Sequence, residues 1–218
     1  MQDPKGFVLR NGRAEMTDFF QLIFNQHVFL QFGHIVSAGL VTATCFVVGI
    51  AAYKIVKGSK ELVFVKTLKL VIPIALASLI LTVGFGDLQG KYAAEHQPMK
   101  LAAMEAQWET QKYAPLSLFS IIDEENGQNK FEIVIPGMLS FMAGSNFPYE
   151  VKGLNDLQKE DESTFGPDDY LPPVNLLFIS FRVMVGLATL MIFILMLGMV
   201  FDWKKKLVEK TWLLKIWC

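Results

Sequence analysis

Two ionisable side chains stand inside long apolar stretches of the sequence. His34 lies in a run over 28–53 without any charged residue, and Arg182 is the one charge in a run over 174–201. Ionisable groups within a membrane are costly and indicate a function. As membrane-spanning helices, these runs would place His34 about 9 Å and Met184 about 15 Å from the outer face of the membrane. Such a pair could bind one iron, as His/Met ligation does in electron-transfer haems, and Arg182 could neutralise haem propionates.

Each of these residues also has a plainer interpretation. A lone histidine in a span often serves as a hydrogen-bonded packing residue. Methionine in a span is ordinarily a flexible filler, and the run that holds Met184 contains three more, at Met191, Met196 and Met199. From residue types and spacing alone, the ligand assignment therefore stays open.

A second candidate site lies in a polar stretch, where 100–110 reads KLAAMEAQWET. These residues favour a helix with Leu101, Met104 and Trp108 on one face. Lys100 and Glu105 could approach a small molecule at the membrane surface. Quinol oxidation releases protons, and a carboxylate is suited to accept one. The alternative is a surface helix whose Lys and Glu side chains are only solvated.

The elements that must position these residues are three apolar stretches. A membrane-spanning helix needs roughly 20 apolar residues, and 28–56, 67–86 and 174–201 meet this requirement in a chain that is 52% hydrophobic. The sequence therefore predicts an all-α, multi-pass transmembrane helical bundle fragment with three spans and a long extracytoplasmic loop. Pro73 is expected in the first turns of the second span, where a proline costs least.

Charge distribution predicts how the chain is oriented. Lysines concentrate in the hairpin after span one and in the tail, whereas the long loop holds 15 acidic and 6 basic residues. By the positive-inside rule, hairpin and tail are cytoplasmic and the loop is outside. A short amphipathic helix over 16–27 is expected on the membrane surface. The predicted segments are a lead (1–27), span one (28–56), a hairpin (57–66), span two (67–86), the loop (87–173), span three (174–201) and a tail (202–218).

Several motifs resemble subunit I of the cytochrome bd-type quinol oxidases. The segment 32–39 resembles the part that supplies the histidine of the low-spin haem b, and 181–184 resembles the part with the second axial ligand. The segment 100–110 is similar to the start of the family's quinol loop, and 212–215 to the start of a following segment. The motifs occur in family order from about residue 28 to the end.

The resemblance implies roles for five residues. His34 and Met184 would be the axial ligands of a low-spin haem b, with Arg182 supporting that haem. Lys100 and Glu105 would bind and oxidise quinol. The implied activity is electron transfer from quinol to dioxygen in the respiratory chain of a bacterial or archaeal cytoplasmic membrane. Whether the quinol is ubiquinol or menaquinol does not follow from these residues.

The family's subunit I is much longer than this chain. Its high-spin haem b and haem d are held by parts that this sequence lacks, so the chain is interpreted as a fragment, a piece of a split subunit or a truncated reading frame. Met1–Pro4 resembles an internal segment of the family, and Trp217–Cys218 resembles the entry to another span. The implied partners are a second large subunit, a small single-span subunit, any remaining part of subunit I, lipid and quinol, with no nucleic acid.

Three alternative functions stay open. The chain could be a non-catalytic haem-binding module for electron transfer, a structural membrane subunit without a cofactor, or a truncated fragment without function. Span count and charge asymmetry do not separate these alternatives; the order of the motifs favours the oxidase.

Overall fold

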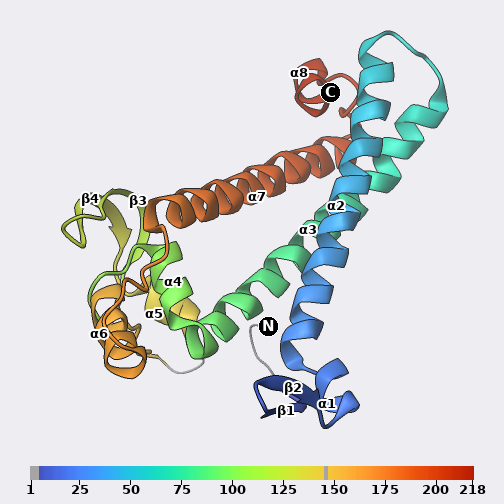
Figure 1. Ribbon diagram of the computed structural model, residues 1–218. Coiled ribbons are helices and arrows are strands. Elements are labelled where there is room, and N and C mark those ends of the chain that lie inside the picture. The colour runs from blue at the N-terminus through green and yellow to red at the C-terminus, as the bar shows by residue number, and fades with distance from the viewer. Residues whose placement is uncertain (1–4, 145–146) are drawn as a thin grey trace. The chain divides into compact units, whose positions relative to one another are not determined.

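The computed structural model describes residues 5–144 and 147–218 (Figure 1). The resemblance noted for Met1–Pro4 therefore lies outside the described residues. The chain forms two compact units, one comprising Met1–Phe29 and Asp87–Val185 and the other Leu30–Gly86 and Gly186–Cys218. Each unit is described by itself.

Within the described residues, three helices are long and apolar enough to cross a membrane: α2 (Gln26–Val56), α3 (Leu62–His96) and α7 (Val174–Trp203). They cover the three predicted spans, which confirms the multi-pass helical fold. Helix α3 continues to His96, so the first part of the predicted loop is helical. Because α3 begins at Leu62, Pro73 lies in its interior and not in its first turns, where the sequence analysis expected it.

The unit of Leu30–Gly86 and Gly186–Cys218 has a core built partly from small residues. Ala51, Ala52 and Ala75 are almost fully buried together with larger side chains such as Leu68. Small side chains allow helix backbones to approach closely, which favours packing within a membrane. Helix α8 (Thr211–Trp217) adds the fully buried Leu213 to this core.

A hairpin opens the other unit. Strands β1 (Phe7–Arg10) and β2 (Arg13–Met16) pair antiparallel, and both turn residues, Asn11 and Gly12, have positive φ. Asn-Gly is the preferred pair for such a two-residue turn. Helix α1 (Phe19–Ile23) follows, its first amides bonded to the Asp18 carboxylate. The helix expected over 16–27 is therefore wrong in extent: its beginning is a strand, and Gln26 already belongs to α2.

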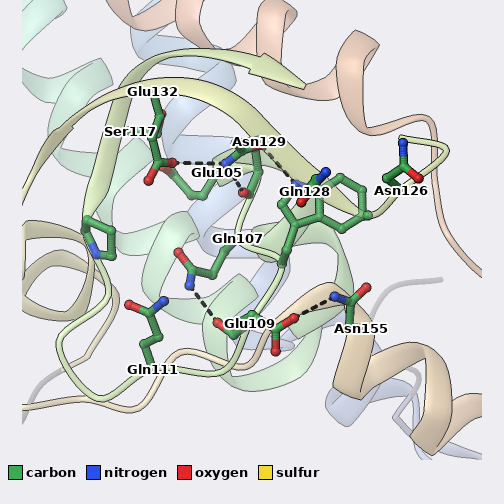
Figure 2. A pocket seen from close by; sticks show the side chains of 14 residues that line it. Glu105, Gln107, Glu109, Gln111, Ser117, Asn126, Gln128, Asn129, Glu132 and Asn155 are labelled. Carbon is green, nitrogen blue, oxygen red and sulfur yellow. Dashed lines mark hydrogen bonds between the residues drawn. The ribbon is translucent and has the colours of Figure 1, made fainter. Parts of the chain in front are cut away.

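The long loop is an ordered assembly with a hairpin that the sequence analysis did not predict. Strands β3 (Leu116–Asp123) and β4 (Gln128–Ile135) pair antiparallel. Helices α4 (Pro98–Glu105), α5 (Met138–Ala143) and α6 (Leu154–Phe165) gather beside them (Figure 1). Asn129 of β4 ties the hairpin to the end of α4, because its amide donates to the Ala106 carbonyl at 3.1 Å (Figure 2).

Helix α4 is shorter than the predicted helix over 100–110. It ends at Glu105 because Ala106 adopts the left-handed conformation, with φ 52°. The Gln107 amide then bonds back to the Ala102 carbonyl at 2.9 Å and the Ala106 amide to the Ala103 carbonyl at 3.3 Å. This is a Schellman motif, which satisfies carbonyls at the end of a helix. Trp108 consequently lies beyond the helix, although it is still buried.

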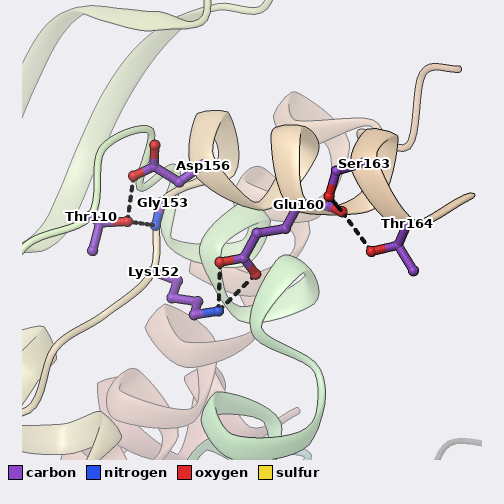
Figure 3. Close-up of polar contacts among 7 residues, drawn as sticks. All are labelled: Thr110, Lys152, Gly153, Asp156, Glu160, Ser163 and Thr164. Carbon is purple, nitrogen blue, oxygen red and sulfur yellow. Dashed lines mark hydrogen bonds and ion pairs between the residues drawn. The ribbon is translucent and has the colours of Figure 1, made fainter. Parts of the chain in front are cut away.

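The N-terminus of α6 docks on the segment that follows α4. The Thr110 hydroxyl donates to the Asp156 carboxylate at 2.7 Å and accepts the Gly153 amide at 3.0 Å (Figure 3). Lys152 pairs with Glu160 of the same helix. A Cβ on Gly153 would lie 2.4 Å from the Trp108 carbonyl oxygen. The chain therefore needs a residue without a side chain at this point.

We expect Gly153→Ala to destabilise the loop assembly. The added methyl would meet backbone atoms, which cannot rotate away, and overpacking of this kind costs roughly 1–3 kcal/mol. Thermal unfolding of the detergent-solubilised protein and the rate of proteolysis within the loop would measure the loss. Gly90→Ala is the matched control, since no described atom lies within 4 Å of the Cβ added there. Equal stability of the two variants would contradict this packing.

Candidate functional site

The most chemically distinctive contact in the loop unit is an ion pair between Glu105 and Arg182. Glu105 is the last residue of α4 and only 4% exposed, and one carboxylate oxygen accepts a hydrogen bond from the Arg182 guanidinium. Arg182 lies on α7, 77 positions further along the sequence. The contact therefore joins the long loop to the membrane-spanning helix that carries Met184.

Arg182 is held by more than its carboxylate partner. Its guanidinium carbon lies 4.9 Å from the ring centre of Phe178 and 5.4 Å from that of Phe181, both distances typical of cation–π contacts. Its Nε is buried and, among the residues that the structure describes, has no hydrogen-bond partner. A buried donor without a partner is costly, so this nitrogen could bind a further anionic group such as a propionate.

Burial dominates the acid–base behaviour of Glu105. Desolvation disfavours the charged carboxylate and raises the pKa of Glu105, and the Arg182 guanidinium opposes this rise without cancelling it. A carboxylate with a raised pKa holds a proton more strongly than a solvated one. It is therefore better suited to take a proton from a bound molecule near neutral pH.

A polar cavity of about 430 Å³ opens beside Glu105 (Figure 2). Its walls come from the segment after α4, from the β3–β4 hairpin and from the start of α6. Besides Glu105, the charged and amide side chains that line it include Gln107, Glu109, Asn129 and Glu132. The buried residue Glu105 thus lines a space that water can enter.

Lys100 lies elsewhere on the same helix. It is exposed, whereas Glu105 is buried. Five residues of an α-helix correspond to about 500° of rotation, so the two side chains point roughly 140° apart. The structure brings Glu105 and Arg182 together but does not join Lys100 to them. A shared role of Lys100 and Glu105 in binding one molecule stays a prediction.

His34, in the other unit, is oriented by a hydrogen bond to a neighbouring helix. Its Nδ1 lies 3.0 Å from the Thr82 carbonyl oxygen on α3. A carbonyl only accepts, so Nδ1 carries the proton and Nε2 keeps its lone pair. Metal-binding histidines are commonly held by a hydrogen bond of this kind. Gly33 permits the arrangement, because a Cβ there would lie 2.5 Å from the Phe85 ring.

Met184 lies on α7 one half-turn beyond Arg182, and its side chain is 52% exposed. Met184 and His34 belong to different units of the chain, and their pairing as ligands of one iron stays a prediction. The tautomer of His34 and the buried Nε of Arg182 fit what a haem requires of its neighbours: a free imidazole nitrogen and a donor for a propionate.

The described residues thus combine three apolar helices, long enough to cross a membrane, with an ordered loop and a buried Glu105–Arg182 ion pair. The family model for cytochrome bd terminal oxidase subunit I matches residues 1–218. The chain belongs to that family. This confirms the resemblance that the motifs indicated.

Individual relatives agree with this assignment. Cytochrome bd ubiquinol oxidase subunit 1 of Bacillus subtilis (strain 168) is 39% identical over 218 residues, which cover 99% of this chain and 46% of that protein. A putative cytochrome bd menaquinol oxidase subunit I of the same organism is 35% identical over 98% of this chain and 47% of its own length. The chain thus spans about half the length of these relatives.

A solved structure supports the fold. The bd oxidase from Geobacillus thermodenitrificans superimposes with a TM-score of 0.83 at 29% sequence identity, covering 99% of this chain and 48% of the matched one.

The Glu105–Arg182 pair is the feature that sequence reasoning missed. Both residues were singled out, but Arg182 was assigned to a haem and Glu105 to a quinol, each without the other. The signal available in the sequence was charge complementarity between a span with one cation and a loop rich in carboxylates. That signal did not select Glu105 from the other acidic residues of the loop.

Removal of either partner of the pair is expected to destabilise the loop unit. Loss of one member leaves the other buried without a counter-charge, which costs roughly 3–5 kcal/mol. We expect Arg182→Met to lower the thermal unfolding temperature strongly. The double variant Arg182→Met with Glu105→Leu should recover much of the loss, because no buried charge remains. Additive effects of the two single substitutions would show that the pair does not form.

Proposed function

We propose that this chain forms the quinol-oxidising, haem b-binding part of a cytochrome bd-type terminal oxidase. In that role it takes electrons from quinol in a respiratory chain whose final acceptor is dioxygen. The observation that carries the proposal is the buried contact between Glu105 and Arg182. It supports an acid–base group of the loop acting next to α7, the helix that also presents Met184.

Oxidation of a quinol removes two electrons and two protons, so the site needs a base and an electron acceptor. Glu105 serves as the base: its carboxylate accepts a proton from a quinol hydroxyl, and its raised pKa favours that transfer. Arg182 limits the rise in pKa and orients the carboxylate through its hydrogen bond. Lys100, on the exposed side of α4, binds the quinol at the membrane surface.

The electron acceptor is a low-spin haem b, which supplies one-electron redox chemistry when bound. In this proposal, His34 binds the iron through Nε2, because its Nδ1 hydrogen bond to Thr82 fixes the tautomer. Met184 would be the other residue that holds the iron. The buried Nε of Arg182 holds a propionate, so that one guanidinium serves both the cofactor and the base.

The dioxygen-reducing machinery is assigned to parts of the oxidase that these 218 residues do not cover. A high-spin haem b and a haem d for dioxygen reduction lie in parts outside this chain, which spans about half of its relatives. We infer as partners the remaining part of subunit I, a second large subunit and a small single-span subunit. The apolar helix α7 leaves room for such neighbours or lipid, since few of its residues are buried within this chain. The complex resides in a prokaryotic cytoplasmic membrane, with residues 87–173 outside.

The haem assignment is tested by a reduced-minus-oxidised optical spectrum of membranes in which the assembled complex contains this chain. We expect His34→Ala and Met184→Leu to remove or shift the low-spin b-type band, because each deletes one axial ligand. Met196→Leu is the matched control, since Met196 is a similarly exposed methionine of the same helix, at 48%.

The same spectra separate the rival functions. A structural subunit would give identical spectra in all variants, which would refute the haem site. A haem-binding module without catalysis would keep the band in the wild type and lose it in the variants, yet the complex would consume no dioxygen with quinol.

Quinol oxidation is expected to depend on pH through Glu105. Only the ionised carboxylate accepts a proton, so kcat falls as pH drops through the raised pKa of Glu105. Glu105→Gln should remove this acidic limb and lower kcat by about 10²-fold, the lower end for a general base. Steady-state turnover of the complex across a pH series measures both effects. An unchanged acidic limb in Glu105→Gln would assign the base to another residue.

A further inference from the structure

A buried base needs a route by which its proton leaves. Glu105 is 4% exposed, and the described structure closes one side of its carboxylate with Arg182. The polar cavity of about 430 Å³ lies on another side (Figure 2). A single water needs roughly 10–15 Å³ of such volume, so the cavity can hold a connected chain of waters in contact with Glu105.

The cavity contains a second carboxylate that is fixed in place. Glu132 of β4 lines the cavity and is exposed to solvent. One of its carboxylate oxygens accepts a hydrogen bond from the Asn129 amide at 3.0 Å. That amide also donates to the carbonyl of Ala106, the residue next to Glu105, at 3.1 Å. Glu132 is therefore tied, through one side chain, to the backbone that carries Glu105.

Asn129 is itself held in one orientation. Its amide oxygen accepts the indole N–H of Trp108 at 2.9 Å, so its nitrogen must point toward Ala106 and Glu132. Trp108 is 5% exposed and packs in the core of the loop unit. The buried Trp108 thus orients Asn129, and Asn129 in turn holds the carboxylate of Glu132.

We propose that Glu132 is a proton-relay residue that receives the proton from Glu105 across the cavity and releases it to the solvent outside the membrane. The step balances without a further reagent: the O–H bond on Glu105 breaks, a proton passes along water, and an O–H bond forms on Glu132. The electrons leave separately to the haem. This inference rests on the proposed function, because it needs Glu105 to take a proton from quinol.

The charges around the cavity favour proton transfer from Glu105 to Glu132. Arg182 faces Glu105 from α7 and opposes protonation there, whereas Glu109 and Glu132 face the cavity from the segment after α4 and from β4. Glu109 accepts a hydrogen bond from Asn155 of α6 at 2.8 Å, so its carboxylate is tied to that helix. Glu132 is thus the carboxylate that is coupled to the end of α4.

Glu132→Gln in the assembled quinol oxidase tests the relay. We expect kcat to fall on the order of tenfold with KM for quinol unchanged, less than the 10²–10⁴-fold attributed to a direct acid–base group. Glu132→Asp should retain most of the turnover. A small diffusible proton carrier, imidazole or formate, should restore turnover of Glu132→Gln as its concentration rises. It accepts the proton and releases it in place of the missing carboxylate.

Glu125→Gln is the matched control, since Glu125 is an exposed residue of the same hairpin that does not line the cavity. It should leave turnover unchanged. Two results would overturn the relay if the wild type still oxidises quinol. One is turnover of Glu132→Gln equal to that of the control, and the other is a loss of turnover that no proton carrier restores. Absence of quinol oxidation in the wild-type complex would instead refute the proposed function, and the relay with it.

Discussion

The ion pair between Glu105 and Arg182 is the interaction on which the rest of the arrangement depends. A carboxylate that is 4% exposed cannot keep its charge without a partner, and a guanidinium on a membrane-spanning helix is equally costly alone. Each residue lowers the energetic cost of burying the charge of the other. Because one belongs to the loop and the other to α7, the contact also fixes the end of α4 against that helix. The acid–base group and the helix with Met184 are thereby held in one unit of the structure.

Much of the loop serves to hold Glu105 in place. The left-handed Ala106 ends α4 directly after Glu105, and the chain then turns so that Trp108 is buried. Asn129 of the hairpin fastens this turn, and α6 packs against the next residues through Thr110. These hydrogen bonds join short elements that are far apart in the sequence, none of which would be stable alone. Together they leave a polar cavity beside a carboxylate that is otherwise closed off from solvent.

The sequence predicted the parts of the fold that depend on composition. Three long apolar stretches with a single charged residue each are stable as helices in a membrane, so their number and positions followed from hydropathy. The sequence did not reveal where α4 ends, because Ala106 and Gln107 are good helix formers. Only tertiary contacts select the left-handed conformation of Ala106. The β3–β4 hairpin was missed because its strands alternate poorly between buried and exposed residues.

The sequence predicted which residues belong to the candidate site, but it did not predict the contacts between them. Residue type and position in the sequence singled out five residues: His34, Lys100, Glu105, Arg182 and Met184. The partner of Arg182 depends on how a distant loop folds back, which no local pattern encodes. The hydrogen bond from His34 to Thr82 likewise joins residues 48 apart, and it depends on the register between two helices. Pairwise geometry at such separations is set by packing and not by spacing.

In the proposed function, Glu105 takes up the proton when quinol delivers its electrons. Infrared difference spectroscopy of the assembled complex, reduced minus oxidised, tests this claim most directly, because a protonated carboxyl has a C=O stretch that the ionised form lacks. We expect a carboxyl band that appears on reduction, shifts in D2O and is absent in Glu105→Gln. A difference spectrum in which the same carboxyl bands persist in Glu105→Gln would contradict the claim.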